Sequence, residues 1–447
     1  MNIIRPFFVL AILITSNLFT IDTAQAALEL NITEGQIKPT PIAVTHFLST
    51  NGDKLGEEIA SVIANDLESS GLFILINPKG FNQSPQSILT DGPRFADWRM
   101  LSAQCLLTGS VEVSGGQVRV QFRLFDVIKG TQLLGLELNI EEKKWRRLSH
   151  MIADQVYARI TGEDGYFNTQ IAFIEEHGPK GKHRAFRLAV MDYDGANTRY
   201  LTDGKNMVFS PRFSPNNRDI AYLAYTHNNT EAHVHVYNMV SGENKLLGKF
   251  TGLSLAPRYS PDGNDIVFSL EKNGSSAIYI KNIQSGEIKA LTQHTDIDVS
   301  PSFSPDGQKI VFSSDRGGAP QLYVMNRDGS NVNRITFDSG RHHQPNWSPR
   351  GDLIACTRGV GGQFHIRVMR PDGSEARSVH VDNSVVESPT WSPNGRVIMF
   401  RKDSLGKSGS SKIYAVDLTG RGLHQIKTPR EASDASWSNL LDKVESD

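Results

Sequence analysis

Two groups of histidines and one acidic turn have spacings that could bind a metal ion. His233 and His235 alternate along one expected strand, so both imidazoles would lie on the same face, and His342 and His343 are adjacent. A zinc site needs three or four protein ligands, and neither pair has an obvious third partner. Residues 192–195 resemble part of a calcium loop but lack the glutamate that completes it. We interpret all of these as strand, loop and turn positions and predict no metal site.

The sequence lacks the motifs of the common catalytic and nucleotide-binding sites. It contains no Gly-x-Ser-x-Gly elbow, no Walker loop, no Gly-x-Gly-x-x-Gly after a strand and no His-Glu-x-x-His. We therefore predict no catalytic residues, no cofactor and a protein that is not an enzyme.

The charge distribution argues against a nucleic-acid-binding protein. Lysine and arginine number 47 against 48 aspartates and glutamates, whereas proteins that bind phosphates normally carry a surplus of positive charge. Residues 143–147 form the one dense basic cluster, and two glutamates precede it. This cluster is either a contact for a membrane or nucleic acid, or the solvated start of a helix, and we favour the helix start.

The first 26 residues have the features of an export signal. Arg5 precedes a 13-residue apolar run over residues 7–19, which is shorter than the roughly 20 residues that a membrane-spanning helix needs. Ala24, Gln25 and Ala26 then give the small-x-small pattern of a signal cleavage site. We expect cleavage between Ala26 and Ala27 and an exported chain with no membrane span; a short membrane anchor is the alternative.

The second half of the chain is a repeat. An aromatic residue followed by serine recurs six times, at spacings of 46, 44, 44, 44 and 46 residues. Five copies continue into proline, a turn and a strand that begins with isoleucine; Cys356 lies within such a strand and should be buried. The motif aromatics are Phe213, Tyr259, Phe303, Trp347, Trp391 and Trp437. Four expected strands per repeat of about 45 residues are typical of a β-propeller blade.

The two ends of the repeat predict how the ring closes. After Trp437 too little chain remains for a second strand, whereas residues 171–174 form a spare second strand before the first motif. We therefore predict a six-bladed propeller over residues 163–447, in which a C-terminal strand near residues 434–440 completes the blade begun at residues 171–177. Closure of this kind leaves few exposed strand edges.

The region before the propeller has a mixed pattern. Apolar residues recur at helical spacing over residues 56–67 and 145–160, and strand patterns cover residues 72–76, 105–113, 118–127 and 132–140. A weaker helical pattern covers residues 93–104. We predict a small α/β domain over residues 37–162, preceded by a flexible partner-binding segment over residues 27–36. Cys105 belongs to this domain, and we expect no disulfide between it and Cys356.

A signal peptide, a small α/β domain and six repeats that close out of phase together resemble the TolB family of the periplasmic Tol–Pal system. The resemblance covers nearly the whole mature chain and is most specific at residues 256–268 and 300–312, where Ser-Pro-Asp-Gly and Ile-Val-Phe are intact.

The resemblance implies a non-enzymatic adaptor that maintains outer-membrane integrity and supports envelope constriction at division. Its implied partners are the peptidoglycan-associated lipoprotein Pal and TolA, together with other outer-membrane lipoproteins and colicin-type toxins. The implied Pal-binding residues at the propeller mouth are Ser210, Leu253, Ala256, Val299, Ser300, His342, His343, Gln344, Glu387 and Ser388. The implied TolA-binding residues are Leu28, Glu29, Leu30, Asn31 and Ile32.

Position within the repeat also suggests which residues surround one open end, or mouth, of the propeller channel. We expect the residues just before each motif to lie in the loops that connect one blade to the next, and six such loops would converge at one end of the channel. An exported hydrolase or lyase with its active site in the channel is the alternative. A sugar-binding module would need a ladder of exposed aromatic residues, which the sequence does not suggest.

Overall fold

The computed structural model describes residues 38–50, 52, 54–178, 184–225, 232–248, 253–404 and 410–441. The predicted signal peptide, its cleavage site at Ala26 and Ala27, and the segment 27–36 lie outside the described residues. Within the described part of the chain, no helix is both long and apolar enough to cross a membrane.

The N-terminal part is a sheet with helices on both faces. Strands follow the order β3-β1-β4-β5-β6, with β2 beside β4; β1 runs parallel to β3 and β4, and β4 to β6 are antiparallel. Its elements are β1 (Thr40–Val44), β2 (Leu48–Ser49), α1 (Leu55–Ser69), β3 (Phe73–Leu75), α2 (Pro85–Asp91), α3 (Phe95–Met100), β4 (Cys105–Ser114), β5 (Gln117–Asp126), β6 (Thr131–Glu141) and α4 (Trp145–Thr161). Two short 3-10 helices lie at Pro78–Gly80 and Glu142–Lys144.

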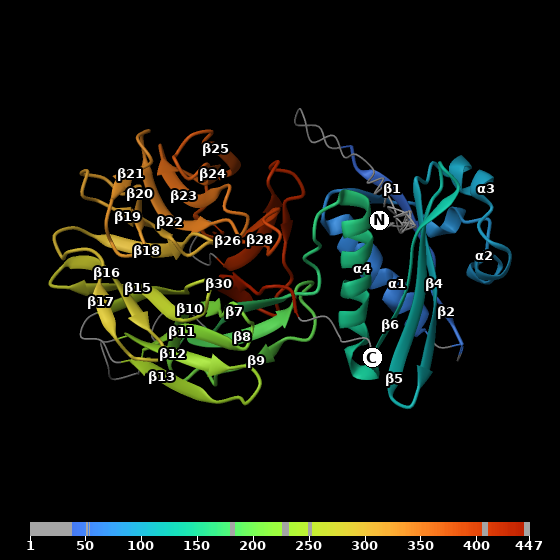
Figure 1. The fold of residues 1–447 in the computed structure, drawn as a ribbon, viewed down its shortest axis with the longest axis horizontal. Coiled ribbons are helices and arrows are strands. Elements are labelled where there is room, and N and C mark those ends of the chain that lie inside the picture. The colour runs from blue at the N-terminus through green and yellow to red at the C-terminus, as the bar shows by residue number, and fades with distance from the viewer. Residues whose placement is uncertain are drawn as a thin grey trace, which may run out of the picture.

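The apolar stripes of α1 and α4 cover one face of this sheet. Ile59 and Ile63 of α1 and Ile152 and Val156 of α4 are fully buried in one cluster with residues of the sheet. A second cluster on the opposite face includes Trp98 of α3. In Figure 1, α1 and α4 lie between the sheet and the propeller, so their far sides are available to join the two parts.

Six four-stranded antiparallel sheets follow, which confirms the predicted propeller with its small N-terminal α/β domain (Figure 1). From the channel outward, the first three blades along the chain are β10–β13 (Met207–Phe213, Asp219–Tyr225, Ala232–Asn238, Asn244–Gly248), β14–β17 (Leu253–Tyr259, Asp265–Lys272, Ser275–Asn282, Ile288–Ala290) and β18–β21 (Asp298–Phe303, Lys309–Ser314, Gln321–Asn326, Asn333–Arg334). The next two are β22–β25 (Arg341–Trp347, Ile354–Val360, Gln363–Met369, Arg377–Asp382) and β26–β29 (Val386–Trp391, Val397–Asp403, Ser411–Asp417, His424–Gln425).

The sixth blade combines the two ends of the repeat. Its strand order is β30-β7-β8-β9, with β30 (Glu431–Trp437) innermost and β7 (Gln170–His177), β8 (Ala185–Asp192) and β9 (Arg199–Tyr200) outside it. Trp437 pairs with Ile171 and Ser433 with Ile174 in an antiparallel register. This is the pairing that the phase of the repeat predicts.

The two cysteines are buried and unpaired, as expected. Burial raises the pKa of Cys105 and of Cys356 to about 12, so both thiols stay protonated at neutral pH. They behave as small apolar residues of their respective cores.

Candidate functional site

Each innermost propeller strand contains a β-bulge at the same repeat position. In all six pairings with the second strand, the register shifts across two residues that come just before the channel-facing residue. In five blades the second of these two residues is proline, which has no N–H to donate to a strand ladder, so a bulge is its favoured place. The motif proline therefore fixes the position of the bulge.

The first residue of each bulge has left-handed backbone, although none is glycine. The φ angles lie between 48° and 57° at Ser210, Ala256, Ser300, Gln344, Ser388 and Asp434. Such a conformation is uncommon for residues with a side chain, and it persists only where the surrounding structure holds it. Six equivalent positions thus form a ring of fixed geometry around the channel.

This bulge ring lines a cavity of about 350 Å³ at one end of the channel. All six left-handed residues contribute to its wall, together with larger side chains such as Phe209 and Tyr225. The opposite end has a cavity of about 300 Å³, which is lined by the aromatic-Ser pairs of all six blades. The channel therefore has two chemically different mouths.

Hydrogen bonds between blades hold the bulge ring. The Ser210 N–H donates to Asp434 Oδ2 at 3.1 Å, and the Ser388 N–H donates to Gln344 Oε1 at 2.8 Å. The Ser300 N–H donates to Ser269 Oγ of the preceding blade at 3.2 Å. Because these bonds satisfy N–H groups that the bulges free, they make the mouth a rigid surface.

The predicted mouth residues lie close together, but in a different element from the one expected. Ser210, Ala256, Ser300, Gln344 and Ser388 are inside the innermost strands, not in the loops between blades. The loop prediction is wrong because the bulge lets the strand continue through the proline to the residues before it. Position in the repeat was a sufficient signal for the ring, and Asp434, at the same repeat position of the sixth blade, completes it.

The other predicted mouth residues flank the ring. Leu253 begins β14, and Val299 is half-buried in β18 opposite Ser313. Burial lowers the pKa of His343 and raises the pKa of Glu387, whose carboxylate lies 3.6 Å from the Arg401 guanidinium.

His342 does not belong to the accessible mouth. Its side chain is 0% exposed, and its Nε2 lies 3.3 Å from Asp338 and 3.3 Å from Arg367 Nη1. Burial, with the nearby arginine charges, lowers its pKa to about 4, although Asp338 opposes this shift. We therefore remove His342 from the predicted partner-binding surface, because a neutral, enclosed imidazole cannot contact a partner directly.

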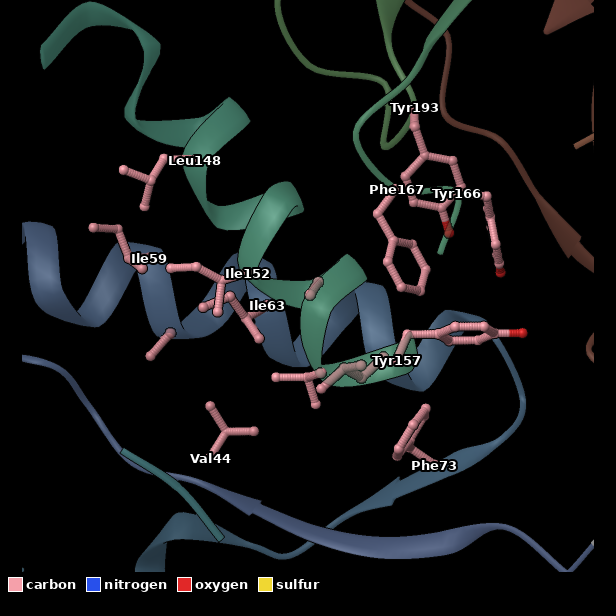
Figure 2. Packing of buried hydrophobic residues seen from close by; sticks show 14 of the residues in the cluster. Val44, Ile59, Ile63, Phe73, Leu148, Ile152, Tyr157, Tyr166, Phe167 and Tyr193 are labelled. Carbon is pink, nitrogen blue, oxygen red and sulfur yellow. The ribbon is translucent and has the colours of Figure 1, made fainter. Parts of the chain in front are cut away.

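A second organised region joins the two domains. Tyr166 and Phe167 follow α4, and Tyr193 lies in the turn after β8; Figure 2 shows these rings gathered beside Tyr157 at the end of α4. Tyr193 stacks on Trp437 with ring centroids 5.9 Å apart. Stacked aromatic contacts of this kind add to the free energy gained from burial.

Charged groups at this interface are paired. His150 of α4 lies 2.6 Å from Asp66 of α1, and Arg146 of α4 forms an ion pair with Asp194 in the turn after β8. Ligand atoms of Asp66, His150 and Asp194 lie within 4.8 Å of one another, a spacing that could hold a metal. Because each carboxylate is already bonded to a cationic side chain, we interpret the cluster as an ion-pair network.

Arg146 belongs to the basic cluster that the sequence analysis interpreted as a contact surface or a solvated helix start. The structure places Arg146 at the domain interface, and Lys143 and Lys144 pair with Glu141. Asp154 of α4 further accepts hydrogen bonds from the backbone of Phe167 and Asn168 at 2.8 and 3.0 Å, which fixes the linker to the helix.

Comparison with known proteins gives consistent matches over both domains. The family model of the TolB beta propeller domain matches residues 157–441, and that of the TolB amino-terminal domain matches residues 28–133. The Tol-Pal system protein TolB of Paramagnetospirillum magneticum is 46% identical over 257 residues, which cover 57% of this chain. The match spans only 57% of that relative's own length.

Solved structures agree with these matches. The crystal structure of TolB from Acinetobacter baumannii is 25% identical, with a TM-score of 0.80 over 90% of this chain and 97% of that chain. Hydrazine synthase of Kuenenia stuttgartiensis, at 14% identity, has a TM-score of 0.50 over 62% of this chain and 47% of its own. The second likeness concerns the fold alone.

Proposed function

Because the chain belongs to the TolB family, we propose that it is a non-enzymatic adaptor of the Tol–Pal system in the periplasm. It binds the lipoprotein Pal through the bulge ring and TolA through residues 27–36, once the signal peptide has been removed between Ala26 and Ala27. In this role it maintains outer-membrane integrity and supports envelope constriction at division. Other outer-membrane lipoproteins and colicin-type toxins would compete for the same mouth.

The observation that carries the proposal is the bulge ring itself. Six strands present side chains of fixed backbone geometry around a cavity of about 350 Å³, and most of the ring residues are small. A rigid concave surface loses little conformational entropy when a protein segment binds to it. The described lining of both channel ends contains one acidic residue, Asp434, and no histidine, which suits binding better than acid–base chemistry.

The test introduces a carboxylate into the ring, or directly beside it, and measures affinity for Pal. We expect Ala256→Asp and Val299→Asp to abolish Pal binding, because an unpaired carboxylate buried at an interface costs about 2–5 kcal/mol. Ala290→Asp and Val240→Asp place the same charge on exposed positions of the propeller and should bind Pal as the wild type does. Thermal unfolding of each variant checks that the fold is intact. If both Ala256→Asp and Val299→Asp bound Pal tightly, the bulge ring would not be the Pal-binding surface.

The TolA contact is tested separately. Deleting residues 28–32 should weaken TolA binding and leave Pal binding largely unchanged, because the two partners are proposed to use different parts of the chain. Unchanged affinity of the truncated protein for TolA would contradict this part of the proposal.

A further inference from the structure

The residue just before the motif aromatic faces the channel in every blade. In four blades it is Ser302, Asn346, Thr390 or Ser436, and in two adjacent blades it is Arg212 or Arg258. Ser302 and Ser436 each accept a hydrogen bond through Oγ from the next blade. Arginine has no acceptor atom, so Arg212 and Arg258 cannot make that bond. They must serve another purpose at this position.

Arg212 is buried with most of its donors unused. The residue is 8% exposed. Its Nη1 donates to the Pro211 carbonyl at 2.6 Å, and its Nε has no partner among the described residues. Burial lowers its pKa to about 10, against the attraction of Asp434. A buried guanidinium is normally paired, because leaving its charge and donors unsatisfied costs free energy.

Arg258 lies in the same part of the channel. Within the described part of the chain, no hydrogen bond or ion pair to its guanidinium is found. Its pKa is lowered well below the ordinary value by burial, and the charge of Arg212 lowers it further. The two like charges are therefore neighbours, and both side chains line the cavities at both ends of the channel.

The local charges do not balance. Asp434 is the one acidic residue in the described lining of these cavities, and its Oδ2 already accepts the Ser210 N–H. Two guanidinium groups with free N–H donors beside one carboxylate leave a net positive charge. An anion with two or more oxygens could accept these donors in the fork geometry that guanidinium groups offer.

We propose that Arg212 and Arg258 form a binding site for a small oxyanion, a phosphate or a carboxylate, inside the propeller channel. A cavity of about 350 Å³ on one side and about 300 Å³ on the other leaves room for such a ligand and gives it two routes of entry. The two arginines also line the bulge-ring cavity of the proposed Pal contact, but the anion site needs no partner protein and is tested without Pal.

The experiment titrates the full mature chain with inorganic phosphate and, in a second arm, with malonate, by isothermal calorimetry. Chloride keeps the ionic strength constant, so that screening does not change during the titration. We expect saturable binding of at least one anion with a stoichiometry of one, and the arm that binds more tightly identifies the oxyanion. Arg212→Gln and Arg258→Gln should each weaken binding at least about tenfold, as loss of a charge-assisted hydrogen bond predicts.

Two further variants keep the test decisive. Arg218→Gln removes a positive charge from an exposed position of the same blade as Arg212 and should bind as the wild type does. Asp434→Asn keeps an oxygen for the Ser210 N–H but removes the competing charge, and should tighten binding severalfold. Absence of binding for both anions, or wild-type affinity in Arg258→Gln, would overturn the proposal, whatever the outcome for Pal.

Discussion

The domain interface and the propeller channel both enclose charged side chains, but these are paired at the interface and unpaired in the channel. At the interface, Asp66 meets His150 and Asp194 meets Arg146, so charges from different elements neutralise each other. In the channel, Arg212 and Arg258 lie side by side with one carboxylate near them. Paired charges fix the relative position of the two domains. Unpaired hydrogen-bond donors around a cavity are available to bind a ligand.

The largest expected effect comes from removing β30, because this strand belongs to both regions. Trp437 stacks on Tyr193 at the interface, and Asp434 lies in the bulge ring. Deleting residues 431–447 exposes the edge of β7 and opens the ring. We expect aggregation or loss of the whole propeller, observed by circular dichroism and size-exclusion chromatography.

A control deletion of residues 442–447 leaves β30 in place and should fold normally. If the longer deletion unfolded at an unchanged temperature, closure of the ring by β30 would not be what stabilises the propeller.

A smaller effect follows from breaking the interface network. Asp66→Ala leaves His150 buried without its partner, which should lower the free energy of unfolding by about 3–5 kcal/mol. Asp352→Ala, at an exposed position, should change it by about 0.5 kcal/mol or less. Chemical denaturation measures both. Similar values for the two variants would mean that the paired network contributes nothing to stability.

The same network predicts a pH dependence. Although burial disfavours the charged ring, the charge of Asp66 and the hydrogen bond to it raise the pKa of His150 to about 9, from 6.5. The folded protein then binds more protons than the unfolded chain between these values, so stability is full below pH 6.5 and falls as the pH rises through 9. The loss should reach about 3 kcal/mol.

Unfolding by urea at pH 6, 7, 8 and 9 measures this slope. His150→Gln should flatten it, because the variant has no group at this place that changes its charge. A slope as steep in the variant as in the wild type would assign the pH dependence to other groups.

The smallest expected effect concerns single bonds in the channel wall. Ser436→Ala removes the acceptor for the Phe213 N–H and should cost about 1 kcal/mol. Arg258→Gln, at the equivalent position of another blade, should leave stability unchanged or raise it, since it removes an unpaired buried charge. Thermal unfolding of both variants in a chloride buffer measures the two changes in stability. Equal losses of stability would mean that the serine and arginine positions of the channel wall do not differ in this respect.

Much of the fold is predictable because the spacing and phase of the repeat determine the blades and how they close. Spacing between motif aromatics sets the length of a blade, and the spare strand at Ile171 shows that the repeat is out of phase with the chain. Helices α1 and α4 follow from apolar residues at three- and four-residue spacing. The bulges were missed because proline in a strand usually signals a loop, and only pairing within the closed ring shows that the strand continues.

The interface and the oxyanion site are less predictable. Asp66 lies between Ile63 and Leu67 on the buried face of α1, and His150 lies between Leu148 and Ile152 on the buried face of α4. A polar residue on an apolar stripe was therefore the available signal for each of these two residues. The sequence does not show that these two residues meet, because that depends on how the helices pack. Similarly, Arg212 and Arg258 occupy the same repeat position, but their meeting in the channel wall follows only from closure of the ring.

Closure by β30 also sets an order of events during synthesis. Strand β7 is the first propeller strand to be made and β30 the last, yet they are neighbours in one blade. Until the final repeat has left the ribosome, β7 has no inner partner and the other five blades cannot complete a circle. Closure of the ring is therefore the last folding step, and it becomes possible only when translation of the chain is nearly finished.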